Sequence, residues 1–267
     1  MGRSWRFVAT ATSFAVFGIG AVVVGTLFFG VLALLLPRRP ARQRLARHGV
    51  RMVVKVFLRF MALLGVLELD VDREGLARLS TAGGSVIVAN HPTLLDVLVL
   101  LAYVEQAGCV VKHSLWRNPF LGPAIRVANY IPSRDPEQLL RDCDAALKRH
   151  ESLIVFPEAT RSVPGEPLRL HRGAASIALN SDALLRVVHF RCEPVFLSKG
   201  DPWYRTPRRR PCLAARVGAS VPAREFQRSG MTRSIAARRL TEALQHELSK
   251  EIQWHARPGA GAQAAAN

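Results

Sequence analysis

The chain has 267 residues, of which 49% are hydrophobic, and it carries a formal net charge of +17. This length suits one large domain or one domain with an appendage, and four widely spaced cysteines argue against a disulfide framework or a zinc site. The positive charge would suit a nucleic-acid-binding protein, but no helix-turn-helix, zinc-finger or RNA-recognition signature is present. We therefore expect no nucleic-acid binding.

The N-terminal part of the chain contains a long apolar run. Residues 7–36 carry no charged side chain, and a Pro-Arg-Arg-Pro stretch at 37–40 ends the run. Thirty helical residues would measure about 45 Å, enough to cross a hydrocarbon layer of about 30 Å. Four glycines also permit a bent hairpin or a re-entrant pair; they are Gly18, Gly20, Gly25 and Gly30. The run exceeds the apolar core of a signal peptide, so it predicts a membrane anchor.

A basic stretch follows the apolar run. All charges between residues 38 and 59 are positive, and five of them recur at helical spacing: Arg44, Arg47, Arg51, Lys55 and Arg59. Apolar residues lie between them, which is typical of an amphipathic helix at a membrane surface, although a solvated basic face gives the same pattern. We expect residues 1–65 to form a membrane anchor and basic interfacial helix, with membrane lipids as partners. Because the basic flank follows the apolar run, the rest of the chain should face the cytoplasm.

The remainder alternates between strand and helix patterns. Strands are predicted at 66–71, 85–89, 109–112, 129–131, 152–156, 186–190 and 212–217. Helices are predicted at 94–106, 118–128, 135–150, 173–180 and 234–254. This alternation predicts an α/β domain over residues 66–256, with a mostly parallel sheet flanked by helices. Residues 257–267 are rich in Gly and Ala and are predicted to be a disordered tail.

In such sheets, chemistry gathers in the loops beyond the carboxyl ends of strands. Three loops qualify: 90–93, 132–135 and 157–162. In the first, His91 leaves a strand and Asp96 lies in the first turn of the next helix, where its carboxylate could accept the ring N–H. The other ring nitrogen could then take a proton from a hydroxyl. A polar hinge between a strand and a helix is the alternative reading of the same residues.

The loop 157–162 belongs to the stretch FPEATRS and carries Glu158 and Arg161. An arginine fork at a sheet edge suits a phosphate group, which it can bind by paired hydrogen bonds and by charge. An ordinary turn stabilised by a Glu–Arg pair would give the same two residues.

NHPTLLD, followed about 65 residues later by FPEATRS, resembles the NHxxxxD and FPEGTRS motifs of the glycerolipid acyltransferase family, the 1-acylglycerol-3-phosphate acyltransferases. The resemblance covers roughly residues 85–200, including NYIPSR and HRGAA. It implies that His91 is the general base and that Asp96 orients it. It also implies that the substrate is bound by Arg134, Glu158, Thr160 and Arg161, with Glu158 orienting Arg161.

The family resemblance implies a reaction in which a fatty acyl group passes from acyl-ACP or acyl-CoA to a hydroxyl of a lysophospholipid such as 1-acylglycerol-3-phosphate. The acyl carrier protein or the coenzyme A thioester would be a co-substrate, and no cofactor or metal is expected. The expected location is the bacterial inner membrane, with the catalytic domain on the cytoplasmic face.

Two departures from the family pattern affect the acceptor. Ala159 replaces the glycine of FPEGTRS, and a Cβ costs about 1 kcal/mol or more if that position needs a positive φ. The second departure is the stretch 192–207, which resembles a branch of the acyltransferase family associated with bacterial aryl-polyene lipid biosynthesis. The alternatives are therefore an acyltransferase for a specialised non-glycerophosphate lipid or a non-enzymatic protein that binds anionic lipids. A serine hydrolase is disfavoured because no G-x-S-x-G stretch occurs.

Overall fold

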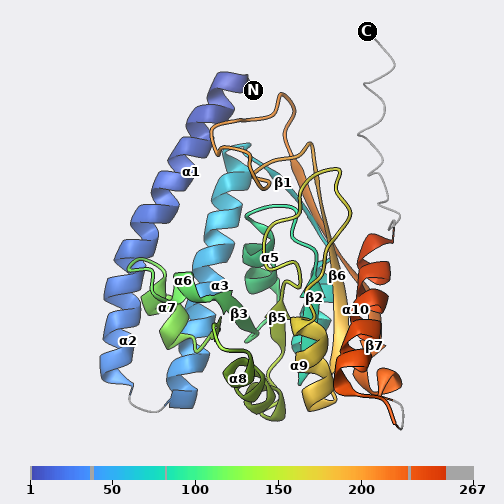
Figure 1. The fold of residues 1–267 in the computed structure, drawn as a ribbon. Helices are drawn as coiled ribbons and strands as arrows, with labels where there is room; N and C mark the ends of the chain where they lie inside the picture. The colour runs from blue at the N-terminus through green and yellow to red at the C-terminus, as the bar shows by residue number, and fades with distance from the viewer. Residues whose placement is uncertain (1, 37–38, 82, 228–229, 251–267) are drawn as a thin grey trace.

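The computed structural model describes residues 2–36, 39–81, 83–227 and 230–250. Its N-terminal part is a long apolar rod made of helix α1 (Arg3–Val23), the π-helical turn η1 (Val24–Phe28) and helix α2 (Phe29–Leu35). Helix α3 (Arg39–Leu63) runs back beside this rod (Figure 1). The stretch Ser4–Val23 is long and apolar enough to cross a membrane, as the sequence predicts. The π-helical turn contains Gly25, one of the glycines at which a break was expected.

The rest of the described chain is an α/β body. Its strands are β1 (Glu68–Val71), β2 (Ser85–Ala89), β3 (Gly108–Lys112), β4 (Ile131–Ser133), β5 (Leu153–Val155), β6 (Leu184–Glu193) and β7 (Cys212–Pro222). Its helices are α4 (Arg73–Thr81), α5 (Asp96–Tyr103), α6 (His113–Trp116), α7 (Gly122–Val127), α8 (Pro136–Lys148), α9 (Gly173–Ser181), the 3-10 helix η2 (Ala223–Phe226) and α10 (Arg233–Ser249). Each predicted strand and helix has a counterpart, most with shifted ends, and residues 251–254 of the last predicted helix lie outside the described residues. Helices α4 and α6 were not predicted.

The seven strands form one sheet in the order β1-β7-β6-β2-β5-β3-β4. All neighbouring pairs are parallel except β6 and β7, which are antiparallel. The predicted mostly parallel sheet is therefore confirmed. Strand β2 is buried along its whole length, because helices cover both of its faces, and it lies between β6 and β5.

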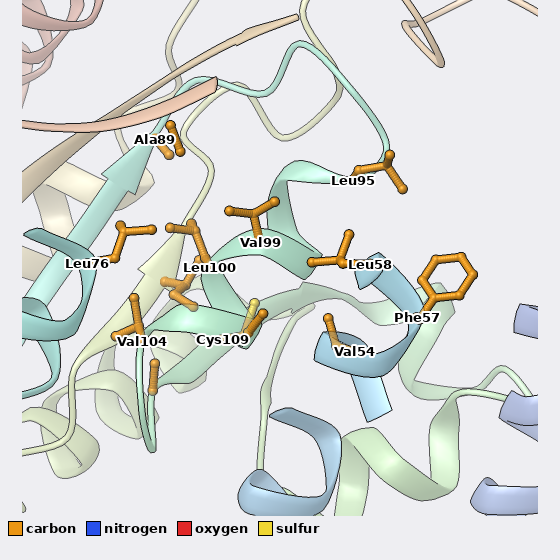
Figure 2. Packing of buried hydrophobic residues seen from close by; sticks show 14 of the residues in the cluster. Val54, Phe57, Leu58, Leu76, Ala89, Leu95, Val99, Leu100, Val104 and Cys109 are labelled. Carbon is orange, nitrogen blue, oxygen red and sulfur yellow. The ribbon is translucent and has the colours of Figure 1, made fainter. Parts of the chain in front are cut away.

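Two hydrophobic clusters lie on opposite faces of the sheet. One includes residues of α1, α2, α3, α5 and α7, and the other includes residues of α8, α9 and α10. Figure 2 shows the first cluster, in which Val54, Phe57 and Leu58 of α3 lie near Val99 and Leu100 of α5. Helix α3 thus shares a core with the α/β body. The division at residues 65 and 66 stays a prediction, and the predicted tail lies outside the described residues.

The basic face of α3 does not point uniformly outward. Arg47 is buried, donates to the carbonyls of Ala128 and Gln106 at 3.0 and 2.7 Å, and forms an ion pair with Glu151 at 2.8 Å. The expectation of a basic face exposed at a membrane surface is therefore wrong at Arg47. The physical reason is that this guanidinium finds its partners in the α/β body and fixes α3 against it.

Candidate active site

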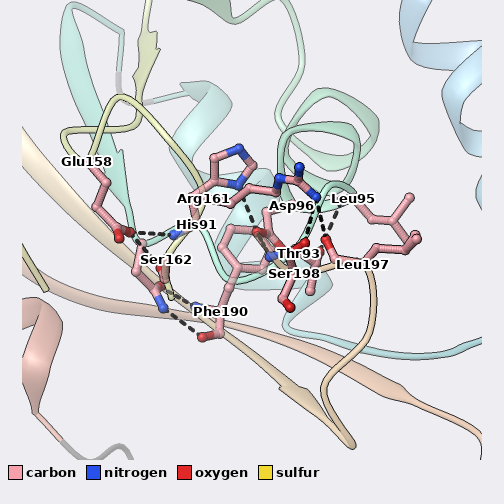
Figure 3. A network of polar contacts seen from close by, with 11 residues as sticks. His91, Thr93, Leu95, Asp96, Glu158, Arg161, Ser162, Phe190, Leu197 and Ser198 are labelled. Atoms are coloured by element: carbon pink, nitrogen blue, oxygen red, sulfur yellow. Dashed lines mark hydrogen bonds and ion pairs between the residues drawn. The ribbon is translucent and has the colours of Figure 1, made fainter. Parts of the chain in front are cut away.

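The candidate site lies where the neighbouring strands β2 and β5 end. Val88 pairs in register with Val155, so the segments that begin at Asn90 and at Phe156 leave the sheet at the same edge. The two segments are joined directly, because the backbone N–H of Ser162 donates to the carbonyl of His91 at 2.8 Å. Figure 3 shows His91, Asp96, Glu158 and Arg161 in one polar network. Two of the three predicted loops, 90–93 and 157–162, therefore meet.

His91 and Asp96 form the predicted pair. Nδ1 of His91 lies 2.9 Å from Oδ2 of Asp96, and the His91 ring packs against the Phe156 ring with centroids 4.4 Å apart. The Asp96 side chain is fully buried, whereas 17% of the His91 side chain is exposed. In Figure 3 the second ring nitrogen of His91 lies on the side away from Asp96. This arrangement leaves one nitrogen of a fixed imidazole for chemistry.

The partners of Asp96 define its role as an acceptor. Its Oδ2 also accepts from the backbone N–H of Thr93 at 2.7 Å, and its Oδ1 accepts from the Thr93 hydroxyl at 2.7 Å. The same hydroxyl accepts from the N–H of Leu95, so its proton points to Asp96. Burial raises the pKa of the Asp96 carboxyl, while the hydrogen bonds from His91 and Thr93 act in the opposite direction. Because both Thr93 groups donate to it, the carboxylate is suited to accept a proton from His91 Nδ1 as well, and Nε2 would then be the nitrogen without a proton.

Glu158 fixes the backbone of His91. Its Oε1 accepts from the His91 N–H at 2.8 Å and from the Ser162 hydroxyl at 2.9 Å, and its side chain is buried. The expectation that Glu158 orients Arg161 is wrong, because the Glu158 carboxylate turns inward to these two donors. A buried carboxylate needs such partners, and the His91 amide supplies one.

Arg161 contacts the segment that follows β6. Its Nη1 donates to the carbonyls of Leu197 and Ser198, both at 2.9 Å. The Leu197 carbonyl also accepts from the N–H of Leu94, two residues before Asp96. Arg161 is therefore held at the same sheet edge as His91, with its guanidinium anchored through one nitrogen.

Two other predicted binding residues lie at the surface. Thr160 is exposed on the loop after β5, next to Arg161. Arg134 is exposed after β4, at the edge of the sheet, and β4 is three strand spacings, about 14 Å, from β2. No contact within the described ranges joins Arg134 to the His91 network. The exposed Lys112, which the sequence reasoning missed, ends the intervening strand β3 in register with Ser133.

Asn90 is a positioning residue that the sequence reasoning also missed. Its side-chain Nδ2 donates to the Phe190 carbonyl at 2.8 Å, and its Oδ1 accepts from the Phe190 N–H at 2.7 Å. The amide thus continues the parallel pairing of β2 with β6 by one residue and sets where His91 leaves the sheet. The available signal was an amide directly before the histidine at a strand end.

Ala159 occupies the left-handed region of backbone conformation, with φ at +54°. Its N–H donates to the Phe156 carbonyl at 3.1 Å, which closes a tight turn after β5. The condition stated for a Cβ cost at this position, a positive φ, is therefore met, and glycine would be the unstrained residue there.

Comparisons with known proteins agree with this geometry. The Acyltransferase family model matches residues 70–190, which include every residue of the His91 network before Leu197. A 1-acyl-sn-glycerol-3-phosphate acyltransferase of Helicobacter pylori is 35% identical over 103 residues, which cover 36% of this chain and 44% of that protein. A protein of the same name from Pseudomonas aeruginosa is 28% identical over 182 residues, covering 65% of this chain and 67% of that one. The match thus spans less than half of the H. pylori relative.

A solved structure shares the fold. The crystal structure of a 1-acyl-sn-glycerophosphate acyltransferase from Thermotoga maritima covers 95% of this chain and 100% of its own, with a TM-score of 0.66 and 19% sequence identity. At that identity the likeness concerns the fold alone. The family model and the two relatives lead to one conclusion: residues 70–190 match the Acyltransferase family, and the chain is similar to 1-acyl-sn-glycerol-3-phosphate acyltransferases.

Proposed function

We propose that this protein is a membrane-associated O-acyltransferase that moves a fatty acyl group from a thioester donor to a hydroxyl of a lysophospholipid such as 1-acylglycerol-3-phosphate. The observation that carries the proposal is the 2.9 Å contact between His91 Nδ1 and the buried Asp96 carboxylate at the end of β2. The two bacterial relatives are named 1-acyl-sn-glycerol-3-phosphate acyltransferases, which supports the choice of acceptor.

In the proposed reaction, Nε2 of His91 takes the proton of the acceptor hydroxyl while that oxygen attacks the carbonyl carbon of the thioester. The C–S bond then breaks, the acyl group stays on the acceptor as an ester, and the proton on His91 passes to the departing thiolate. Asp96 stabilises the imidazolium formed between these two proton transfers. No acyl-enzyme is formed, and the donor is either acyl-ACP or acyl-CoA.

The acceptor phosphate is assigned to two basic groups at the same sheet edge, the half-buried Arg161 and the exposed Arg134. Arg161 sits on the loop next to Glu158, and its anchored guanidinium offers further N–H groups to an anion. Arg134 contributes charge from the neighbouring loop, and Thr160 is an exposed hydroxyl beside Arg161. Glu158 acts through the His91 backbone, so it is a positioning residue.

Membrane association is assigned to the helical hairpin of α1, α2 and α3. Many large apolar side chains on its outer face are exposed, including Ile19, Leu27, Leu34 and Leu63. The inner face of α1 packs on α3, and Phe17 contacts Phe57 with ring centroids 5.0 Å apart. This packing favours a rod that lies along the lipid surface and brings lipid acceptors to the site. The proposed location is the bacterial inner membrane, with the α/β body on the cytoplasmic face.

The first prediction concerns His91. In detergent micelles with 1-acylglycerol-3-phosphate as acceptor, His91→Ala should lower acyl transfer by roughly 10²–10⁴-fold, because the general base is lost. Transfer is measured with acyl-CoA and acyl-ACP in separate reactions. His246→Ala, an exposed histidine on α10, is the matched control and should keep full activity. Full activity in His91→Ala would exclude the mechanism, and no transfer by the folded wild-type protein from either donor would exclude this acceptor.

A specialised acceptor is the second candidate function, and the observation that favours it is the left-handed Ala159 beside the candidate phosphate-binding Arg161. Rescue of a bacterium that lacks its own lysophosphatidate acyltransferase separates the two candidates. Rescue supports 1-acylglycerol-3-phosphate, whereas failure by a well-expressed, membrane-bound protein supports another acceptor. The aryl-polyene branch stays a prediction, as does a non-enzymatic role in binding anionic lipids.

A further inference from the structure

The segment between β6 and β7, residues 194–211, forms a long loop that extends to the N-terminal end of α1 (Figure 1). We refer to it as the β6–β7 loop. Its first residues hold Arg161, but the stretch from 199 to 210 has no part in the proposed chemistry. This stretch contains two neighbouring aromatic residues, Trp203 and Tyr204, and a run of three arginines at 208–210.

The two aromatic side chains of the loop are exposed although they pack on α1. Trp203 stacks on Phe7 with ring centroids 6.1 Å apart and contacts Phe14 at 5.6 Å, while Tyr204 meets Trp203 edge-on at 5.8 Å. Even so, 42% of Trp203, 57% of Tyr204 and 44% of Phe7 stay exposed. Tryptophan and tyrosine combine an apolar ring with a polar tip, and both are enriched where a protein meets the headgroup region of a bilayer.

The charge of the loop is almost entirely positive. Lys199, Arg205, Arg208 and Arg209 are exposed, and Asp201 is the one acidic residue in the stretch. Asp201 offsets one of these charges, because it pairs with Nη1 of Arg205 at 3.2 Å, and it also accepts from the Ser198 hydroxyl at 2.7 Å. The Arg205 side chain nevertheless stays 69% exposed, so its other N–H groups can still bind an anion. The net exposed charge of the loop is positive and complements an anionic surface.

The loop is fixed to the apolar hairpin. Arg6 of α1 is buried and donates to the carbonyls of Pro207 and Arg208. Arg210 donates to the carbonyls of Ala62 and Leu67, both at 2.7 Å. The exposed rings of the loop therefore continue the exposed apolar face of α1, where Val8 and Ile19 also point outward. Aromatic rings at the end of an apolar helix, flanked by arginines, fit the boundary between acyl chains and headgroups.

We propose that the β6–β7 loop is a lipid-docking element for an anionic bilayer. Trp203 and Tyr204 lie at the headgroup level beside the first turns of α1, and Arg205, Arg208 and Arg209 contact lipid phosphates. The proposal rests on the membrane association given above and not on the acyl-transfer reaction. It assigns a partner, the anionic headgroup layer, to the basic stretch 199–210, which has no part in the proposed reaction.

A single-tryptophan protein tests where Trp203 lies. Trp5→Phe, Trp116→Phe and Trp254→Phe are combined so that Trp203 is the sole tryptophan, and the protein is bound to phosphatidylglycerol vesicles with brominated acyl chains. Trp203 fluorescence should be quenched, and bromine near the headgroup should quench it more than bromine near the chain end. Unquenched fluorescence from vesicle-bound protein overturns the proposal, as does stronger quenching by the deeper bromine.

A matched pair of charge variants tests the arginines. Arg205→Gln, Arg208→Gln and Arg209→Gln together should weaken binding to vesicles with phosphatidylglycerol on the order of 100-fold, at roughly fivefold per charge. The control removes the same charge on the opposite face of the sheet through Arg141→Gln, Arg238→Gln and Arg239→Gln. These residues are exposed on α8 and α10, and the control should bind nearly as the wild type does. Equal weakening by both triple variants would show that only total charge matters and would overturn the proposal.

The aromatic contact is tested with two substitutions of one residue. Trp203→Ser should weaken binding to the same vesicles about tenfold, whereas Trp203→Tyr should restore most of it, because a tyrosine ring also suits the headgroup layer. If the serine variant unfolds, the fluorescence and arginine measurements still decide the proposal. Vesicle binding is measured without donor or acceptor, so its result is independent of the acyl-transfer assay.

Discussion

Ala159 combines a left-handed backbone with a Cβ atom at the candidate site. The turn that it makes after β5 separates two charged neighbours, Glu158 and Arg161, which bond to different parts of the structure. A residue in this conformation costs about 1 kcal/mol relative to glycine, although glycine loses more entropy on folding. The strain is therefore a property of one residue and can be measured by one substitution.

We predict that Ala159→Gly raises the free energy of unfolding by about 0.5–1 kcal/mol, because relief of the left-handed strain exceeds the entropy cost of glycine. For a protein of this size the melting temperature should rise by roughly 1–3 °C. Ala145→Gly is the matched control, since Ala145 is exposed within α8 and its replacement should lower stability by about 1 kcal/mol. Thermal unfolding that moves in the same direction for both variants would contradict the interpretation.

Glu158 gives the site a defined pH dependence. Burial raises the pKa of its carboxyl above the ordinary value of 4.5, against the hydrogen bonds from Ser162 and from the His91 backbone, which lower it. A folded-state pKa above that of the unfolded chain contributes stability at low pH. That contribution is lost as the pH rises from about 4.5 through the raised value.

We therefore predict that Glu158→Gln becomes more stable relative to the wild type as the pH rises from 4.5. The glutamine oxygen can accept the same two hydrogen bonds, and no buried charge has to form. The urea midpoints of both proteins, measured from pH 4 to pH 8, should coincide best at the acidic end and then diverge. A difference that stays constant with pH would show that desolvation of Glu158 is not the cause.

At the scale of the elements, the best sequence predictions rest on local signals. The strand 85–89 is predicted to the residue, because five consecutive buried residues are bounded by glycine and by Asn90. Helix α8 begins at Pro136, one residue after its predicted start, and the Asp135 carboxylate accepts from the Gln138 N–H at 3.0 Å. By contrast, β6 and β7 are longer than predicted, because their antiparallel pairing extends both strands and depends on residues far apart in the chain.

The same distinction explains the candidate site. His91 and Asp96 lie on one strand-to-helix connection, and their places at the strand end and in the first turn of the helix predicted the contact. Glu158 and Arg161 are equally close in sequence, but Glu158 bonds to a backbone group 67 residues away, and Arg161 to carbonyls 36 and 37 residues away. Spacing carries no information about such contacts. The prediction that Arg47 is exposed was wrong for the same reason, since its partner Glu151 lies 104 residues further along the chain, just before β5.

The π-helical turn η1, which precedes α2, approaches the α/β body more closely than a residue with a Cβ atom would allow. A Cβ atom on Gly25, in the π-helical turn, would lie 2.9 Å from the Phe120 carbonyl oxygen, whereas a Cβ on Gly20 would meet nothing within 4 Å. We predict that Gly25→Ala lowers the melting temperature in detergent, because the rod must move away from the loop before α7. Gly20→Ala is the control in the same rod. It should raise the melting temperature, because alanine stabilises a helix by up to about 1 kcal/mol relative to glycine. A rise for both variants would remove the role assigned to Gly25.

At the scale of the whole molecule, the apolar rod contributes buried side chains to the hydrophobic core in addition to its proposed contact with the membrane. Phe29 and Leu32 of α2 are buried with Val54 and Met61 of α3 in the cluster that reaches the sheet. We predict that a protein lacking residues 1–36 aggregates or unfolds without a cooperative transition, because removal of these residues exposes the cluster to water. Size-exclusion chromatography and thermal unfolding check the outcome. A monodisperse truncated protein with one sharp transition would show that the rod is a dispensable tether.

The pairing of Arg6 with the β6–β7 loop also sets an order of events during synthesis. Arg6 binds the carbonyl of Pro207, 201 residues further along the chain. At a synthesis rate of about 5–20 residues per second, that partner leaves the ribosome roughly 10–40 s after the helix that needs it. Throughout this interval the β6–β7 loop cannot cover the first turns of α1, so a lipid surface is a suitable environment for the part of the nascent helix that the loop covers later.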